Sequence, residues 1–328
     1  MPVKLVSFEV STALGPVVRI GAIDAHGEIV DLHAAGTHRL LAAGSSPGAA
    51  HRIAAAMLPG EMVAFIEGGP VSLQAARDAL EFAAAKGAGT GPPRIIHDLA
   101  TITMLPPVPH PPLVRDFMAF ETHLRNIYPR LGREIPPEWY AMPVYYKGNP
   151  GSLGTHGQDV PIPSYADALD YEFELAIVIG KTGKDIPRDA AMDHVFGFMI
   201  YNDFSERAIQ SREMSVGLGP AKGKDFHNAH VFGPYLVTKD EVNDPYDLRM
   251  TCRLNGEVVC DDSSGTMHWT FEDMIAHASM DERIAVGEIF GSGTVGNGSG
   301  AERGKFLKRG DVIELDVDGL GLLRNQVR

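Results

Sequence analysis

Short apolar runs alternate with alanine-rich segments over the first hundred residues of the chain. The runs that predict β-strands are residues 3–10, 17–23, 28–31 and 62–65. The segments that predict helices are residues 38–41 and 72–86. We therefore predict a small α+β domain over residues 1–105. Its alanine-rich helices carry few side chains able to perform chemistry, so a scaffolding or dimer-supporting role is favoured over a catalytic one.

Glycine and proline clusters follow this first domain. Residues 87–93 are rich in both, and prolines recur through residues 106–112. Proline lacks a backbone donor and glycine tolerates most backbone conformations, so both residue types interrupt regular structure. We interpret these clusters as a linker and the entry to a second domain over residues 106–328.

The second domain has a different pattern. After residue 113, apolar β-type segments separated by Gly, Pro, Asn and Asp turns predominate. Helices are predicted only at residues 117–128, 203–213 and 270–280. The predicted fold class is therefore α+β and mostly β, with a rolled or barrel-like set of mixed sheets in the second domain.

Composition and charge narrow the classes of partner. The chain has 328 residues, 44% of them apolar, and a formal net charge of -13. That charge repels phosphates, so nucleic acid and anionic membranes are not expected partners. An anionic substrate must then be held by a local group of cations or by a metal ion.

The same sequence favours a reducing compartment. The two cysteines, Cys252 and Cys260, have no metal-ligand spacing and are too few to cross-link a chain of this length. The amino terminus reaches Glu9 before an apolar signal core forms, and charged residues and Pro59 interrupt the apolar window 49–66. We expect a cytoplasmic protein without its own membrane anchor.

Two glutamates on one predicted strand are the first candidate for chemistry. Side chains alternate between the faces of a strand, so Glu172 and Glu174 project together while Phe173 and Leu175 project the other way. Two carboxylates about 7 Å apart beside an apolar run repel each other unless a cation lies between them. A divalent metal site is one interpretation, and a solvated edge strand is the alternative.

Two further carboxylates occur near predicted element boundaries. Asp203 follows an apolar run and precedes a helical pattern, where it could bind a metal or cap the helix. Asp116 and His123 are seven residues apart, which on a helix is two turns along one face. Such a helix would deliver both side chains to one site.

The candidate ligands offer only oxygen atoms. Hard Mg²⁺ or Mn²⁺ prefers such ligands, whereas zinc favours His or Cys, and an iron site of two histidines and one carboxylate is not supplied. His123 is then free for proton transfer. The remaining histidines interpreted as surface or hydrogen-bonded groups are His156, His227, His230 and His268.

Two glycine-rich segments offer weaker signals. Residues 219–226 place Lys222 and Lys224 beside glycines, which suits a clamp for a substrate carboxylate or enolate, although solvated loop lysines are the alternative. Residues 291–296 match the dinucleotide pattern Gly-x-Gly-x-x-Gly. No helix pattern follows them, so an oxyanion-binding turn or plain backbone geometry is favoured over a dinucleotide site.

Together these motifs resemble those of the fumarylacetoacetate hydrolase superfamily, from about residue 112 to the end of the chain. The elements that carry the resemblance are Asp116 and His123, Glu172 and Glu174, Asn202 to Gln210, Gly223 to Phe226, and Ser292 to Thr294. The resemblance implies a mixed β-roll catalytic domain, a homodimer and a bacterial-type member. Met118 stands where the tyrosine-degradation enzyme has a tyrosine that contacts its substrate, so the substrate of that enzyme is not carried over.

The resemblance also implies roles for individual residues. The implied metal ligands, for Mg²⁺ or Mn²⁺, are Asp116, Glu172, Glu174 and Asp203. His123 is the implied base, Glu302 its partner, and Lys224 a catalytic cation. The implied substrate-binding residues are Arg207, Gln210, Tyr146 and Thr294.

Three functions are weighed. The leading hypothesis is hydrolysis of a C–C bond in a 1,3-dioxo acid, such as an acylpyruvate of aromatic catabolism, by water that His123 activates. The alternative is decarboxylation or tautomerisation of an oxo acid of the oxaloacetate type at the same metal site, which needs no attacking water. A protein that binds an oxo acid without turnover is the third hypothesis, and the candidate base weighs against it.

Overall fold

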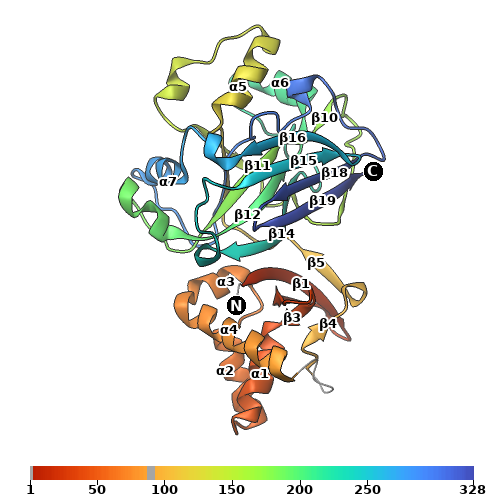
Figure 1. Cartoon of the computed structure of the whole chain (residues 1–328), viewed down its shortest axis with the longest axis vertical. Helices are drawn as coiled ribbons and strands as arrows, with labels where there is room; N and C mark the ends of the chain where they lie inside the picture. Colours follow the sequence, from red (N-terminus) through yellow and green to blue (C-terminus); the bar gives the residue numbers. More distant parts are fainter. Residues whose placement is uncertain (1–2, 87–92) are drawn as a thin grey trace.

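The computed structural model describes residues 3–86 and 93–328. Residues 87–92, most of the predicted linker, lie outside the described part. Figure 1 shows a smaller amino-terminal part, drawn in red to orange, below a larger part that holds the remaining strands. No helix in the described residues is long and apolar enough to cross a membrane.

The amino-terminal part combines a small set of strands with four helices. Its strands are β1 (Lys4–Thr12), β2 (Gly15–Ile23), β3 (Ile29–Asp31), β4 (Ile96–His97) and β5 (Ile102–Leu105). Its helices are α1 (Leu32–Ala42), α2 (Pro47–Met57), α3 (Met62–Glu67) and α4 (Gly69–Lys86), with a 3-10 turn at Leu99–Thr101. The predicted strand at residues 62–65 is wrong, because this segment forms α3. A short apolar run has no periodicity that separates a strand from a buried helix, and Met62, Phe65 and Ile66 follow helical spacing into the core.

The larger part contains most of a twelve-stranded mixed sheet. Its strands there are β6 (Val114–Phe117), β7 (Tyr145–Gly148), β8 (Leu153–Thr155), β11 (Phe173–Ile179), β12 (Val195–Asp203), β14 (His230–Thr238) and β17 (Ile289–Gly291). A five-stranded sheet holds β9 (Asp159–Val160), β15 (Arg249–Leu254), β16 (Glu257–Ser263), β18 (Val312–Val317) and β19 (Gly321–Val327). The short strands β10 (Leu169–Asp170) and β13 (Ser205–Glu206) pair with each other. This mixed architecture confirms the predicted fold class.

The two parts share the twelve-stranded sheet. Strand β1 pairs with β14 in antiparallel register, with Lys4 opposite Val237 and Leu5 opposite Leu236. The sheet order is β4-β3-β2-β1-β14-β12-β11-β17-β6-β7, with β5 on β1 and β8 on β14. Strand β5 ends at Leu105, where the predicted first domain ends, but the division into two domains stays a prediction.

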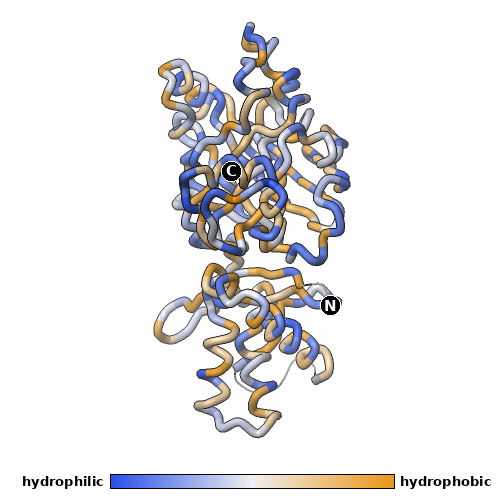
Figure 2. Tube along the Cα trace, turned by 90° about the vertical axis from the view of Figure 1, so that its left-hand side faces the viewer, coloured by the Kyte–Doolittle hydropathy of each residue, from blue (hydrophilic) through white to orange (hydrophobic). Residues whose placement is uncertain are grey.

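The central strands are buried on both faces. Along β11, Leu175 and Ile177 join the core cluster that includes the five-stranded sheet, whereas Ala176 and Val178 join the cluster that includes Phe65 of α3. A strand covered on both faces becomes a continuous apolar run, which is the pattern at residues 175–179. Figure 2 shows hydrophobic stretches running through the inside of both parts and hydrophilic stretches in many outer loops.

Three helices of the larger part test the sequence predictions. They are α5 (Glu121–Ile127), α6 (Arg207–Val216) and α7 (Phe271–Ser279). The helix predicted at residues 270–280 is confirmed as α7, which begins with a capping box of Thr270 and Asp273. The other two predicted helices begin later than expected, at Glu121 and Arg207, because strands β6, β12 and β13 continue into their predicted starts.

These later starts correct two details of the candidate site. Asp116 belongs to β6, so it does not share a helix face with His123 of α5. Asp203 ends β12 and does not cap α6, because Glu206 is the N-cap and accepts from the amides of Ala208 and Ile209. Both aspartates are thereby left with side chains at strand ends.

The 3-10 turns of this part are Tyr128–Leu131, Pro137–Tyr140, Arg188–His194, Lys239–Glu241, Ser264–Thr266 and Ala301–Arg303.

Candidate active site

A cavity of about 480 Å³ lies among β6, β7, β11, α5 and α6. The proposed ligands Asp116, Glu172 and Glu174 line it. The remaining predicted site residues that line it are His123, Tyr146, Gln210, Lys224 and Thr294. One cavity therefore brings together side chains that are up to 178 positions apart in the sequence.

Four carboxylates meet at one point of this site. One oxygen atom from each of Asp116, Glu172, Glu174 and Asp203 lies within 4.8 Å of the others, and all four side chains are buried. The sheet produces this meeting, since β6 pairs with β17, β17 with β11 and β11 with β12. Gly291 on β17 allows the approach, because a Cβ there would lie 2.6 Å from Oδ1 of Asp116. Their role as metal ligands stays a prediction.

The chemistry of this cluster fits a hard divalent cation. Within the described residues, the buried Oδ1 of Asp116 and Oε1 of Glu174 have no hydrogen-bond partner. Burial raises the pKa of both carboxyl groups well above their usual range, and Asp203 and Asp116 respectively raise it further. Uncompensated buried carboxylates are costly, and a cation with oxygen ligands would satisfy them. The donor set suits Mg²⁺ or Mn²⁺.

Lys224 and Tyr146 complete the inner part of the cluster. The Lys224 ammonium is buried and pairs with Glu172 at 2.5 Å and with Asp203. Burial opposes its charge, but Asp203 and Glu172 outweigh burial and raise its pKa. The Tyr146 hydroxyl donates to Oδ2 of Asp203 at 2.7 Å. Lys224 is therefore a fixed cation at physiological pH, suited to hold anionic oxygens and unsuited to act as a base.

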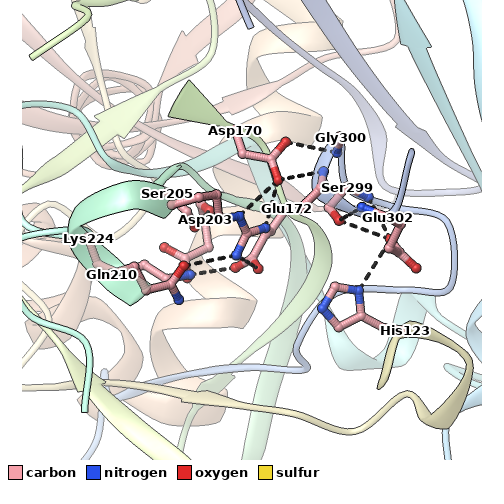
Figure 3. A network of polar contacts seen from close by, with 12 residues as sticks. His123, Asp170, Glu172, Asp203, Ser205, Gln210, Lys224, Ser299, Gly300 and Glu302 are labelled. Carbon is pink, nitrogen blue, oxygen red and sulfur yellow. Dashed lines mark hydrogen bonds and ion pairs between the residues drawn. The ribbon is translucent and has the colours of Figure 1, made fainter. Parts of the chain in front are cut away.

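His123, which also lines the cavity, forms a pair with Glu302. Nδ1 of His123 lies 3.2 Å from Oε2 of Glu302. Figure 3 marks this contact with a dashed line. Glu302 also accepts from the amides of Asn297 and Ser299, from the Ser299 hydroxyl and from the Asn126 amide group. Burial raises the pKa of Glu302, but the contact with His123 and these donors outweigh burial and lower it. An ionised Glu302 can orient the imidazole of His123.

Arg207 lies differently from the other predicted substrate-binding residues. Its guanidinium pairs with Asp170 at 2.8 Å and with Glu172 at 2.7 Å, and it is not among the residues that line the cavity. Gln210 and Thr294 do line the cavity. The structure therefore places Arg207 against a proposed ligand, whereas direct contact with substrate stays a prediction.

The glycine-rich turn at residues 291–296 supports the cluster. Gly293 has a φ of +79°, a Cβ there would lie 2.5 Å from the Phe117 carbonyl oxygen, and its amide donates to Glu174 at 3.0 Å. The next helical segment is only the 3-10 turn Ala301–Arg303. The turn therefore provides the close approach of backbone to carboxylate, and the interpretation against a dinucleotide fingerprint agrees with this geometry.

Two buried groups beside the site are not predicted as site residues from the sequence, where His230 is interpreted only as a surface or hydrogen-bonded histidine. His230 has its Nδ1 3.1 Å from Asp203 and 2.7 Å from the Tyr201 hydroxyl, and it is fully buried. Asp170 accepts from the amides of Gly300 and Ala301. Neither residue belongs to a recognisable spacing, although Asp170 stands two positions before Glu172.

Comparison with protein-family models identifies the family of the chain. The model of the fumarylacetoacetate (FAA) hydrolase C-terminal family matches residues 113–328. The chain belongs to the fumarylacetoacetate hydrolase family. This membership confirms the resemblance in the sequence, and the matched region contains every predicted site residue.

Three relatives of this chain are named as oxaloacetate tautomerases, although the family is named for a hydrolase. The mitochondrial oxaloacetate tautomerase fahd2 of Xenopus laevis is 31% identical, covering 100% of this chain and 91% of its own length. Oxaloacetate tautomerase YisK of Bacillus subtilis is 30% identical over 82% of this chain and 87% of its own length. The human mitochondrial oxaloacetate tautomerase FAHD2A is 34% identical, with shares of 82% and 80%. Because these names include mitochondrial and bacterial proteins, a cytoplasmic location for this chain stays a prediction.

Solved structures agree with the fold. A fumarylacetoacetate hydrolase from Exiguobacterium antarcticum aligns with a TM-score of 0.70 at 24% identity, covering 99% of each chain. The fumarylpyruvate hydrolase of Pseudomonas aeruginosa, in complex with Mn²⁺ and pyruvate, aligns with a TM-score of 0.57 at 24% identity. That alignment covers 66% of this chain and 88% of the other. At these identities the likeness establishes the fold.

Proposed function

We propose that this family member is a divalent-metal-dependent enzyme that interconverts the keto and enol forms of a short oxo acid of the oxaloacetate type. The observation that carries the proposal is that one cavity is lined by three carboxylates of the cluster and by His123, which pairs with Glu302. The oxaloacetate tautomerases at 30 to 34% identity, which match 82 to 100% of the chain, support this reaction over hydrolysis.

The residues of the cluster would hold the cation and the oxygen end of the substrate. Asp116, Glu172, Glu174 and Asp203 would bind Mg²⁺ or Mn²⁺, which when bound supplies Lewis-acid polarisation of a 2-oxo group. Lys224 places a fixed positive charge beside Glu172 and Asp203. That charge stabilises negative charge on the substrate oxygen as the enolate forms.

His123 would carry the proton. Conversion of keto to enol moves one proton from carbon 3 to the oxygen on carbon 2 and requires no water. With Nδ1 directed to Glu302, the other nitrogen of His123 can take the proton from carbon and return it to oxygen. Glu302 balances the imidazolium charge between the two transfers.

Hydrolytic cleavage of a 1,3-dioxo acid is the second candidate, because the same histidine–glutamate pair can deprotonate a water molecule. This reaction adds water across a C–C bond and yields two shorter acids, whereas tautomerisation leaves the carbon skeleton intact. Decarboxylation of oxaloacetate would instead release carbon dioxide and pyruvate. The three reactions therefore differ in products that can be counted separately.

The test is a substrate panel with the full chain and added Mg²⁺ or Mn²⁺. Oxaloacetate enol is followed by its ultraviolet absorbance, acylpyruvates and fumarylpyruvate by loss of the diketo chromophore, and pyruvate by a coupled assay. The proposal predicts fast metal-dependent decay of the enol without matching pyruvate release. Cleavage of acylpyruvates at a higher kcat/KM than enol conversion would replace it with the second candidate.

The predicted partners of this chain are a small-molecule ligand and a second copy of the chain. Members of this family act on small acids, and we propose an oxo acid as the ligand of this chain. A homodimer, implied by the sequence resemblance, stays a prediction that sedimentation of the purified chain would check.

A further inference from the structure

Asp170 is a fully buried carboxylate outside the residues that line the cavity. It ends the short strand β10, two positions before Glu172. Figure 3 shows it between Gly300, in the turn that carries Glu302, and the side chain of Glu172. A buried carboxylate without contact to substrate needs another reason for its position, since taking it out of water is costly.

One set of its contacts fixes the turn of Glu302. Oδ1 accepts from the amide of Gly300 at 2.8 Å, and Oδ2 accepts from the amide of Ala301 at 3.0 Å. A Cβ on Gly300 would lie 2.5 Å from Oδ1 of Asp170, so a glycine at this position permits the close approach. Asp170 therefore holds the backbone one and two positions before Glu302.

The other set of contacts fixes Glu172 through Arg207. Oδ2 of Asp170 accepts from Nε of Arg207 at 2.9 Å and lies 2.8 Å from Nη2. Nη1 of Arg207 lies 2.7 Å from Oε1 of Glu172. Because a guanidinium is planar and rigid, an arginine held by Asp170 holds Glu172 in a fixed direction.

We propose that Asp170 is a positioning residue. It sets the distance between the proposed metal ligand Glu172 and the general base His123 with its partner Glu302. The inference rests on the proposed function for its kinetic consequence, but its structural basis is independent of the substrate. A proton transfer requires the base within hydrogen-bond reach of a carbon whose position the cluster determines. One side chain that holds the turn of Glu302 directly, and Glu172 through Arg207, keeps that distance constant.

The variant Asp170→Asn tests the proposal with little change of shape. It removes the negative charge and turns one oxygen acceptor into a donor that faces the Ala301 amide and Arg207. Arg207 is then balanced by Glu172 alone and competes with a cation for that carboxylate. Loss of such outer contacts typically costs about 10- to 100-fold in metal affinity or activity. We expect kcat to fall by about that factor while KM changes less than about 3-fold.

The matched control is Asp31→Asn in the amino-terminal part. Asp31 is also buried, accepts from the Ala34 amide at 2.9 Å and lies 3.7 Å from Arg19. It undergoes the same chemical change without touching the site, so it reports the effect of general destabilisation. We expect Asp31→Asn to retain wild-type Mn²⁺ affinity in calorimetry and wild-type kcat at a temperature where both variants are folded.

A second variant, and a double-mutant cycle between Asp170 and His123, separate a positioning role from a merely structural one. Arg207→Lys keeps the charge but reaches only one of the two carboxylates, so it should weaken Mn²⁺ binding in the direction of Asp170→Asn even if that variant fails to fold. In a His123→Gln background, Asp170→Asn should lower kcat by less than in the wild type, because both changes act on one step.

The outcomes are distinct from those of the proposed function. If no oxo acid is turned over, the proposed function fails, and the Mn²⁺ affinities of the Asp170 and Arg207 variants against Asp31→Asn still decide this inference. Both affinities equal to that of the control would overturn it. The inference would also be overturned if the kcat losses of Asp170→Asn and His123→Gln multiplied fully in the double variant. If wild type binds no Mn²⁺ in calorimetry, Asp170 has no ligand to position, and both proposals fall together.

Discussion

The two walls of the cavity are built in different ways. The carboxylate wall lies on or beside adjoining strands of one sheet, and its four residues are at most 6% exposed. The base wall places His123 on the seven-residue helix α5 and Glu302 in a turn beside it. A strand ladder fixes side chains through many backbone bonds, whereas so short a helix depends on its side-chain contacts. The ligand wall is therefore the more rigid one, and the base wall is held by Asn126, Asp170 and Ser299.

The largest expected effect comes from removing the metal or a ligand. Chelation followed by dialysis should abolish turnover, and Mg²⁺ or Mn²⁺ should restore it better than Zn²⁺, because the cluster offers oxygen ligands. Glu174→Gln and Asp203→Ala should weaken Mn²⁺ binding in calorimetry by more than about 100-fold, beyond the loss of an outer-shell partner. The exposed Glu257→Gln on β16 is the matched control and should bind as wild type does. Unchanged Mn²⁺ binding in both ligand variants contradicts the assignment.

The next effect concerns the base wall alone. His123→Gln should leave Mn²⁺ affinity within about 2-fold and lower acylpyruvate hydrolysis by about 10² to 10⁴. Tautomerisation should lose less, near the lower end of that range, since a solvent base can replace the imidazole at an activated carbon. Steady-state kinetics on both substrates with one enzyme preparation measures the difference. A variant with normal rates on both would remove His123 from the mechanism.

A smaller loss is expected at the partner of the base. Glu302→Gln keeps the shape but removes the charge that supports the imidazolium, so kcat should fall by about 10- to 100-fold. The double variant with His123→Gln should lose less than the product of the two single losses, because the pair acts as a unit. Full additivity of the free energies would show that Glu302 acts elsewhere.

The smallest effect lies at the outer edge of the base wall. Asn126 donates to Glu302 at 2.9 Å from α5, so Asn126→Ala should lower kcat by less than about 10-fold without changing Mn²⁺ affinity. Its neighbour Arg125, which pairs with Glu121 on the exposed side of the same helix, provides the control Arg125→Ala. Equal losses in the two variants would mean that α5 responds to general destabilisation and not to the Glu302 contact.

Much of the site could be predicted because its residues form local motifs. The alternation at Glu172 and Glu174 follows from strand geometry, and the order of motifs was enough to place the chain in its family. The prediction for Asp116 and His123 put both residues in one site but gave the wrong reason. Their spacing fits a helix, yet Asp116 belongs to a strand because β6 pairs with β17 across 175 positions of sequence.

The sequence by itself determined the fold class, the family, the oxygen-only character of the candidate ligands and the presence of a histidine and a glutamate that could act together. These features depend on residue type and short-range periodicity, which are written directly in the chain. The tertiary structure alone decided that Arg207 faces Asp170 and Glu172, that Lys224 is fixed as a cation, and that Asp170 and His230 are buried beside the site. Burial, charge and direction at these positions arise from long-range strand pairing and packing, and no local pattern specifies which distant side chains will meet.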